Sequence, residues 1–229
     1  MTEAANQTSA LREDNIMSKN TISNSVIRRL PRYHRFLGEL EANGYVRISS
    51  RELAEKMGLT ASQIRQDFNC FGEFGQQGYG YNVSALRGEI GRILGLDRVT
   101  PMILLGAGNL GRAIASHIDF RSKGFELVGI FDASKEIIGR KIGDITVSDI
   151  SGLDSFCRRT KPKGAVLCIP KEAAAKEVER LIGLGIKAFW NFTHYDLRID
   201  HADIAVENVH LGDSLATLSY RLNPNSNVC

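Results

Sequence analysis

Three glycines near the middle of the chain have the spacing of a phosphate-binding turn. They follow a short apolar segment, residues 102–105, and form a G-x-G-x-x-G pattern. In such a turn the first glycine allows a sharp bend, the second lets the backbone approach a pyrophosphate, and the third lets the next helix lie against the sheet. Backbone N–H groups at that helix N-terminus then face the phosphates. We predict cofactor contacts from Gly106, Ala107, Gly108, Asn109, Leu110 and Gly111.

An acidic residue ends the next apolar segment. Residues 126–131 look like a strand, and Asp132 follows 21 residues after Gly111. A carboxylate at this spacing accepts hydrogen bonds from the adenosine ribose, and it would repel the 2'-phosphate of NADP(H). The pattern therefore favours NADH or NAD+. The alternative interpretation is a βα turn without a ligand, in which Asp132 only caps a helix.

Alternating strands and helices must position these residues. Strands are expected at 145–147, 164–169, 187–190 and 202–206, and helices at 153–160 and 171–182. This alternation predicts a Rossmann-type α/β domain with a parallel sheet over residues 100–209. Ile169 and Pro170 end one strand at the edge where open sheets bind ligands, as do Asn191 and Phe192. They either line the nicotinamide side of the pocket or only turn the chain.

Two helix-start signals lie close together in the N-terminal part. Ser49 with Glu52 and Thr60 with Gln63 each have capping-box spacing, and Gly58 ends the first helix. Along the second helix the apolar residues Ile64, Phe68 and Phe71 share one face. The other face carries hydrogen-bonding side chains. A helix-turn-helix with such a face can read the major groove of DNA.

The flanking segments complete a winged-helix domain over residues 22–95. A helix is expected at 25–43, a β-hairpin wing at 71–81 and a last helix at 83–94. The alternative is a small helical domain with an Arg-rich solvated face. The predicted DNA contacts are Arg28, Arg29, Arg32, Ser62, Gln63, Arg65, Gln66, Asn69, Gln76 and Gln77.

Composition excludes several other classes of protein. The net charge of +3 is small, but residues 22–95 carry ten Arg and Lys against seven Asp and Glu. No apolar run approaches 18 residues and no signal peptide is apparent, so we expect a cytoplasmic protein without a membrane segment. The four cysteines lack metal-ligand spacing, so no metal site is predicted.

Both ends of the chain are set apart from the two domains. Residues 1–21 and 223–229 are polar, and we expect them to be mobile tails. Between 210 and 222, Leu211, Leu215, Leu218 and Leu222 have helical spacing. This apolar stripe needs a cover, which is either its own domain or a partner chain that exchanges the helix.

Together these motifs resemble the Rex family of redox-sensing transcriptional repressors over roughly residues 22–222. The most specific ones are 63–68 (QIRQDF), 71–75 (FGEFG), 78–81 (GYGY), 106–111 (GAGNLG) and 206–209 (VENV). The resemblance implies a homodimer with an exchanged C-terminal helix and no catalytic residues. It also implies binding to double-stranded operator DNA when NADH is scarce, and release when NADH accumulates.

The sequence departs from the family pattern at five positions. Family members commonly have Lys where this chain has Gln66, and basic residues where it has Gln76 and Gln77. Because glutamine pairs with adenine, we expect palindromic operators richer in A·T. The family usually has Tyr and Asp where this chain has His117 and His210, so these histidines are predicted to lie in the cofactor pocket.

Two other functions fit parts of the sequence. One is an NAD-dependent dehydrogenase with an N-terminal appendage, for which His194 and Tyr195 are candidate acid and base residues. No separate substrate domain follows the cofactor fold, which weighs against it. The other is a nucleotide-binding scaffold that does not bind DNA.

Overall fold

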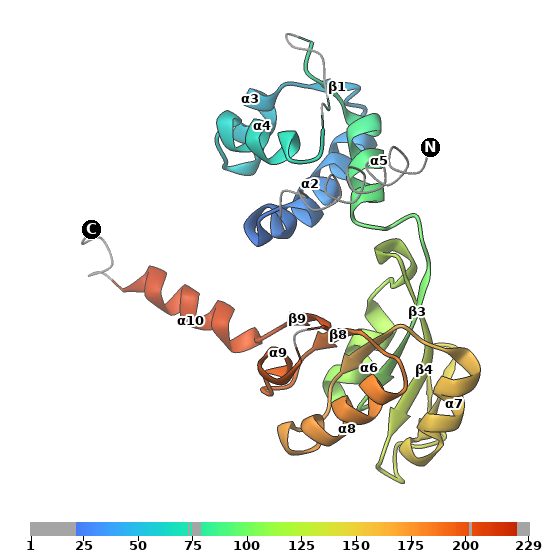
Figure 1. The fold of residues 1–229 in the computed structure, drawn as a ribbon. Helices are drawn as coiled ribbons and strands as arrows, with labels where there is room; N and C mark the ends of the chain where they lie inside the picture. The colour runs from blue at the N-terminus through green and yellow to red at the C-terminus, as the bar shows by residue number, and fades with distance from the viewer. Residues whose placement is uncertain (1–21, 73, 75–78, 202, 224–229) are drawn as a thin grey trace, which may run out of the picture. The chain divides into compact units, whose positions relative to one another are not determined.

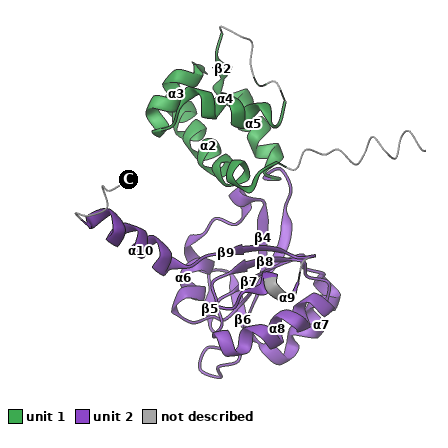
Figure 2. Cartoon of the chain, turned by 60° about the vertical axis from the view of Figure 1, so that its left-hand side comes forward, with its two compact units in different colours: residues 1–95 green, residues 96–229 purple. Residues whose placement is uncertain are grey.

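A computed structural model describes residues 22–72, 74, 79–201 and 203–223, with the side chains of residues 199 and 200 left aside. The chain divides into two compact units after Gly95 (Figures 1 and 2). The predicted tail 1–21 and nearly all of the tail 223–229 lie outside the described residues. Within the described part, no helix is both long and apolar enough to cross a bilayer.

The first unit is built from helices around a small apolar core. Its elements are α2 (Asn24–Ala42), β1 (Arg47–Ile48), α3 (Ser50–Met57), α4 (Ala61–Asn69), β2 (Tyr81–Asn82) and α5 (Val83–Ile93). The core packs Tyr33 of α2 edge-on against Phe68 of α4, with ring centroids 5.1 Å apart. This contact fixes the outer side of α4, since Phe68 and Ile64 must both face inward.

The turn between α3 and α4 follows the sequence signals closely. Ser49 and Glu52 form the predicted capping box, and Gly58 ends α3 with a φ of +65°. Leu59 N–H then donates to Ala54 O over 2.9 Å, which closes the helix end. The predicted helix-turn-helix is therefore confirmed as a structural element.

The wing differs from the prediction. The strand β2 does not pair within the described part of segment 71–81, but with β1, antiparallel, with Ile48 opposite Tyr81. A two-residue strand gives almost no alternation in the sequence, so its partner before α3 was not predictable. Gln76 and Gln77 lie outside the described residues.

The second unit contains a seven-stranded sheet in the order β5-β6-β4-β3-β7-β8-β9, parallel except for the β5–β6 pair. The strands are β3 (Thr100–Leu105), β4 (Phe125–Asp132), β5 (Lys141–Ile142), β6 (Ile145–Asp149), β7 (Gly164–Leu167), β8 (Ala188–Asn191) and β9 (Ala205–Asn208). From β3 the chain proceeds to β4 and β6 on one side, and to β7, β8 and β9 on the other. The order thus reverses between β3 and β7, where open sheets bind ligands at the carboxyl ends of the strands.

Helices cover the sheet on both faces (Figure 2). They are α6 (Asn109–His117), α7 (Leu153–Thr160), α8 (Lys171–Gly183) and α9 (Leu197–Asp200). The last helix, α10 (Leu211–Leu222), projects away from the sheet (Figure 1). Ile103 and Leu105 face the core formed with α7 and α8, whereas Met102 and Leu104 face the core that includes α6. This alternation follows from the two-residue period of a strand.

Candidate cofactor site and nucleic-acid interface

The glycine loop has the tight geometry that its spacing predicts. Gly106 has a φ of +92°, and a Cβ there would lie 2.4 Å from Cys168 O. A Cβ on Gly111 would lie 1.8 Å from Gly106 O. Both separations are far below van der Waals contact, so only glycine fits at these two positions. Gly106 permits the turn and Gly111 lets α6 approach the end of β3.

The N-terminus of α6 is open to an anion. Gly108 is the N-cap residue, no side chain caps the helix, and its first turn contains no acidic residue. A Cβ on Gly108 would meet nothing within 4 Å, and Asn109 and Leu110 beside it are exposed. The backbone N–H groups of this turn therefore have free space in front of them and the helix dipole behind. The loop fits the pyrophosphate of a dinucleotide.

Asp132 ends β4 beside the glycine loop. Its Oδ2 accepts a hydrogen bond from Ala107 N–H at 2.6 Å, and its Oδ1 accepts one from Ser134 N–H at 2.8 Å. The side chain is half-buried, so it is positioned but still accessible. The carboxylate is thus hydrogen-bonded to the phosphate-binding turn, at the place where an adenosine ribose would follow the pyrophosphate.

Ile169 and Pro170 follow β7, the strand on the other side of the switch point. A Cβ on Gly106 would lie 3.0 Å from Ile169 Cγ2, which puts Ile169 against the loop. Pro170 is exposed and begins α8 as its N-cap residue. Cys168 just before them contributes no chemistry, because burial raises the pKa of its thiol to about 12.

The two predicted histidines lie at the ends of two different helices. His117 is the last residue of α6, about 12 Å along the helix from Asn109, and its Nδ1 lies 3.0 Å from Ala113 O. His210 caps α10 and stacks on His194, with ring centroids 5.5 Å apart. Contacts of His117 and His210 with the cofactor stay predictions.

Asn191 serves the fold rather than an open pocket. It is fully buried, and its Nδ2 donates to Tyr195 O and to Asn208 Oδ1, each at 2.9 Å. Its Oδ1 accepts from Thr193 Oγ1 at 2.7 Å. These bonds tie the carboxyl ends of β8 and β9 together, so Asn191 turns the chain, as one of the two interpretations of the sequence held.

The outer face of α4 presents the predicted polar side chains. Ser62, Arg65, Gln66 and Asn69 are all exposed, on the side away from Ile64 and Phe68. Arg65 donates to Ser50 Oγ and Ser62 Oγ, both at 3.2 Å. This face has the hydrogen-bonding character of a major-groove reader.

One predicted capping box is only half formed. Thr60 Oγ1 accepts from Gln63 N–H at 3.1 Å, but the Gln63 side chain does not return to Thr60. Its Nε2 donates instead to Asp67 Oδ1 at 2.8 Å. The buried carboxylate outcompetes the exposed cap, since it offers a charged acceptor away from water.

Asp67 is the residue that the sequence analysis missed. It is fully buried and accepts from Arg29 Nε at 2.6 Å, Arg29 Nη2 at 2.7 Å and Tyr33 Oη at 2.7 Å. An acidic residue on the apolar face, between Ile64 and Phe68, was the available signal. Arg29 was predicted to contact DNA, but its guanidinium is committed to Asp67. Arg32 donates to Met57 O at 2.5 Å, and Arg28 is exposed.

Asp67→Ala is expected to destabilise the protein by about 3–5 kcal/mol, because it leaves the Arg29 guanidinium and the Tyr33 hydroxyl without their buried acceptor. Burial would raise the pKa of Asp67, but the hydrogen bonds from Arg29, Tyr33 and Gln63 outweigh it and hold the pKa below its usual value. The stabilisation is therefore present above the unfolded pKa of about 4 and is lost as the pH falls below it.

Urea unfolding of the full chain at pH 7 and at pH 3 measures both effects. The difference between wild type and variant should shrink at pH 3. The exposed Glu55→Ala on α3 is the control and should change stability little. An Asp67→Ala chain as stable as wild type at pH 7 would contradict the assignment.

Within the part of the chain that the structure describes, no group of three or more His, Cys, Asp and Glu side chains could hold a metal ion.

The comparisons with known proteins point to DNA binding by the first unit and nucleotide binding by the second, as the geometry does. The family description "Putative DNA-binding protein N-terminus" matches residues 21–69, and "CoA binding domain" matches residues 97–195.

A curated relative covers nearly the whole chain. The redox-sensing transcriptional repressor Rex from Thermoanaerobacter sp. is 57% identical over 208 residues, which are 90% of this chain and 92% of that protein. The chain belongs to the Rex family. Rex of Clostridium perfringens (Type A) is 52% identical over 207 residues, 90% of this chain and 97% of that protein.

Solved structures of a Rex-family repressor called RSP have the same fold. RSP in complex with β-NAD+ and operator DNA matches with a TM-score of 0.83 and 55% identity, covering 89% of this chain and 94% of that one. RSP in complex with β-NADH matches with a TM-score of 0.81 and 52% identity, covering 89% and 95%. Rex relatives are named as transcriptional repressors, not as dehydrogenases, which weighs against the enzymatic interpretation of His194 and Tyr195.

Proposed function

We propose that this Rex-family chain represses transcription according to the ratio of NADH to NAD+. It binds palindromic operator DNA when NADH is scarce and releases it when NADH is bound. The observation that carries the proposal is the presence, in one chain, of an open glycine loop beside Asp132 and an exposed polar face on a recognition helix. RSP, which shares both units, has been solved with operator DNA and with each form of the cofactor.

Each part of the cofactor has a matching group in the second unit. The loop from Gly106 to Gly111 would hold the pyrophosphate, and Asp132 the adenosine ribose. Ile169 and Pro170 would flank the nicotinamide, which is the redox-active group. NADH should bind more tightly than NAD+, because burying the positive nicotinamide against Ile169 costs free energy. The carboxylate of Asp132 should exclude NADPH.

The DNA contacts fall on the first unit. Ser62, Gln63, Arg65, Gln66 and Asn69 would face the bases and the backbone of the major groove. Arg28 and Arg32 would add phosphate contacts, and Gln76 and Gln77 would extend the surface as a wing. The glutamines favour A·T-rich operators. A DNA target of this kind also places the protein in the cytoplasm of its cell.

Release of DNA on NADH binding requires a dimer with two states that differ in their affinity for NADH. A ligand with equal affinity for both states does not shift the equilibrium between them. In the DNA-binding state the two recognition helices must be about 34 Å apart to enter adjacent major grooves. In the NADH-bound state the second units of the two chains would close on each other and change this spacing. Such a dimer needs a contact surface on each chain.

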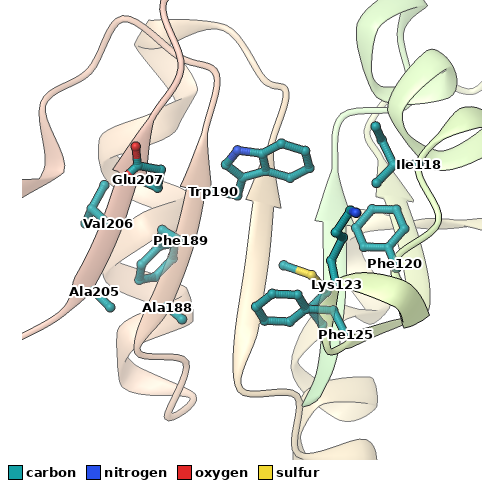
Figure 3. Close-up of a pocket in the computed structure, with 11 residues that line it drawn as sticks. Ile118, Phe120, Lys123, Phe125, Ala188, Phe189, Trp190, Ala205, Val206 and Glu207 are labelled. Carbon is teal, nitrogen blue, oxygen red and sulfur yellow. The ribbon is translucent and has the colours of Figure 1, made fainter. Parts of the chain in front are cut away.

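The C-terminal helix α10 is a candidate for this contact surface. All residues of α10 are exposed, including Leu211, Leu215, Leu218 and Leu222, at 52–75% of their full area. An apolar stripe of this kind needs an apolar partner surface. The sheet of the second unit offers a groove of about 420 Å³, into which Phe120, Phe125 and Trp190 project (Figure 3). We propose that α10 of a second copy lies there.

Leu215→Asp combined with Leu218→Asp is expected to abolish the dimer, because it puts two charges into the middle of the stripe. Analytical ultracentrifugation should show the mass of one chain. The emission of Trp190, the only tryptophan in the sequence, should shift as the groove becomes solvated. Thr217→Asp, exposed on the opposite side of the same helix, is the control and should leave the dimer intact. A double variant with the mass of two chains would rule out α10 as the dimer contact.

The function is tested by titrating a protein–DNA complex with cofactor. Fluorescence anisotropy of a labelled A·T-rich palindromic duplex should fall on addition of NADH, and less on addition of NAD+ or NADPH. No oxidation of NADH with small carbonyl substrates should be detected. A complex that persists at saturating NADH would overturn the proposal.

A further inference from the structure

The amide of Gln63 is held in one orientation. Gln63 lies in the first turn of α4, half-buried, and its Nε2 donates to Asp67 Oδ1 at 2.8 Å. The oxygen and nitrogen ends of a glutamine amide have nearly the same shape, so geometry alone does not tell them apart. The chemistry of the partner decides which end faces it.

Asp67 can only accept. Its Oδ1 also accepts from Arg29 Nη2 and its Oδ2 from Arg29 Nε and Tyr33 Oη, so the buried side chain is an ion paired with a guanidinium. These hydrogen bonds outweigh burial and keep the pKa of Asp67 low, so it remains a carboxylate at neutral pH. If the Gln63 amide were reversed, Oε1 would lie against Oδ1, and two acceptors would face each other without a proton.

The amide oxygen therefore lies on the side away from Asp67. Among the described residues, no group donates a hydrogen bond to Gln63 Oε1. Gln63 lines a polar hollow of about 610 Å³ together with Gln66 and Asn69, two exposed residues of the same helix. It also belongs to the N-terminal half of the recognition helix, the part that contacts base edges in helix-turn-helix proteins.

We propose that Asp67 fixes Gln63 as a reader of adenine in the operator. Oε1 accepts a hydrogen bond from adenine N6, and the second N–H of Nε2, which Asp67 does not use, donates to adenine N7. Guanine is rejected because it presents O6, an acceptor, where adenine presents a donor. Asp67 does not touch the DNA and is a positioning residue. The inference rests on the proposed DNA-binding function and adds which base one side chain selects.

Selection from a randomised palindromic duplex library tests the assignment. The full-length wild type should select adenine at one position of each half-site that Gln63→Leu no longer distinguishes. Gln66→Leu is the matched control and should change a different position. Both selected pools should still be released by NADH.

A base analogue tests the same contact without depending on the folding of a variant. Replacing that adenine with purine, which lacks the N6 amino group, should weaken binding of the wild type by about tenfold. The same replacement should not weaken binding of Gln63→Leu further. Equal losses for both proteins would overturn the proposal.

Asp67→Asn tests the positioning role. Asparagine can present either end to Gln63, so the amide is free to turn its nitrogen toward guanine O6, and the selected position should accept guanine as well as adenine. A folded Asp67→Asn that still excludes guanine would overturn the role of Asp67. If circular dichroism shows that this variant does not fold, the purine experiment decides whether Gln63 contacts adenine.

The outcomes separate the inference from the proposed function. If the wild type selects no sequence that NADH releases, the proposed function fails. If it selects an NADH-sensitive operator but Gln63→Leu alters no position, only the adenine contact is wrong.

Discussion

Gly111→Ala is expected to weaken NADH binding by about 10- to 100-fold and to leave a repressor that responds only weakly to NADH. The added Cβ would lie 1.8 Å from Gly106 O, which is backbone and cannot rotate away. Either α6 or the glycine loop must therefore move, and overpacking of this kind costs about 1–3 kcal/mol or more. The movement displaces the N–H groups that would hold the pyrophosphate.

Isothermal titration with NADH and anisotropy with operator DNA measure the two halves of this prediction. DNA affinity should be retained, because the first unit has its own core. Gly152→Ala is the matched control: it lies in the same unit, a Cβ there meets nothing within 4 Å, and its backbone suits alanine. An unchanged NADH affinity in Gly111→Ala would show that the cofactor binds elsewhere.

Arg65→Ala is expected to abolish specific operator binding while NADH affinity stays the same. Arg65 is exposed, and its hydrogen-bond partners Ser50 and Ser62 are neutral hydroxyls at 3.2 Å, so its removal should cost the fold little. Arginine on a recognition helix makes bidentate contacts to guanine worth about 1–3 kcal/mol each. A palindrome would lose this contact twice, which amounts to a loss of about 30- to 20,000-fold.

Operator and random-sequence duplexes must be compared for this variant, since a phosphate contact would weaken both equally. Arg92→Ala, another exposed arginine of the first unit, controls for the loss of one positive charge. If Arg65→Ala lost NADH binding as well, the residue would be part of the fold and not of the DNA interface.

Elements with strong local signals were predicted to within a few residues. The helix expected at 153–160 is α7 with the same bounds, and the capping box of Ser49 and Glu52 begins α3 as its spacing requires. The glycine loop and Asp132 were also placed side by side. In each case the signal lies in a continuous segment, where helix periodicity or the strand–turn–helix pattern determines the structure directly.

Features that depend on distant partners were not predictable. The pairing of β1 with β2 joins residues on either side of the helix-turn-helix, and β5 and α9 are too short to show a period. Arg29 looked like one of several exposed cations, because the carboxylate that engages it is 38 residues away. The place of His117 in the pocket was inferred from its position relative to Gly111 in the family pattern, and it stays a prediction.

The protonation of the two cysteine thiols in the α/β unit affects how such a protein would sense redox changes. Burial raises the pKa of Cys168 to about 12 and that of Cys157 to about 11, so both are essentially without thiolate at neutral pH. Peroxide and disulfides react with thiolates and would find little to attack there. The redox signal would then be the reversible binding of NADH, which ends when the cofactor dissociates. No reductase would be needed to restore the protein.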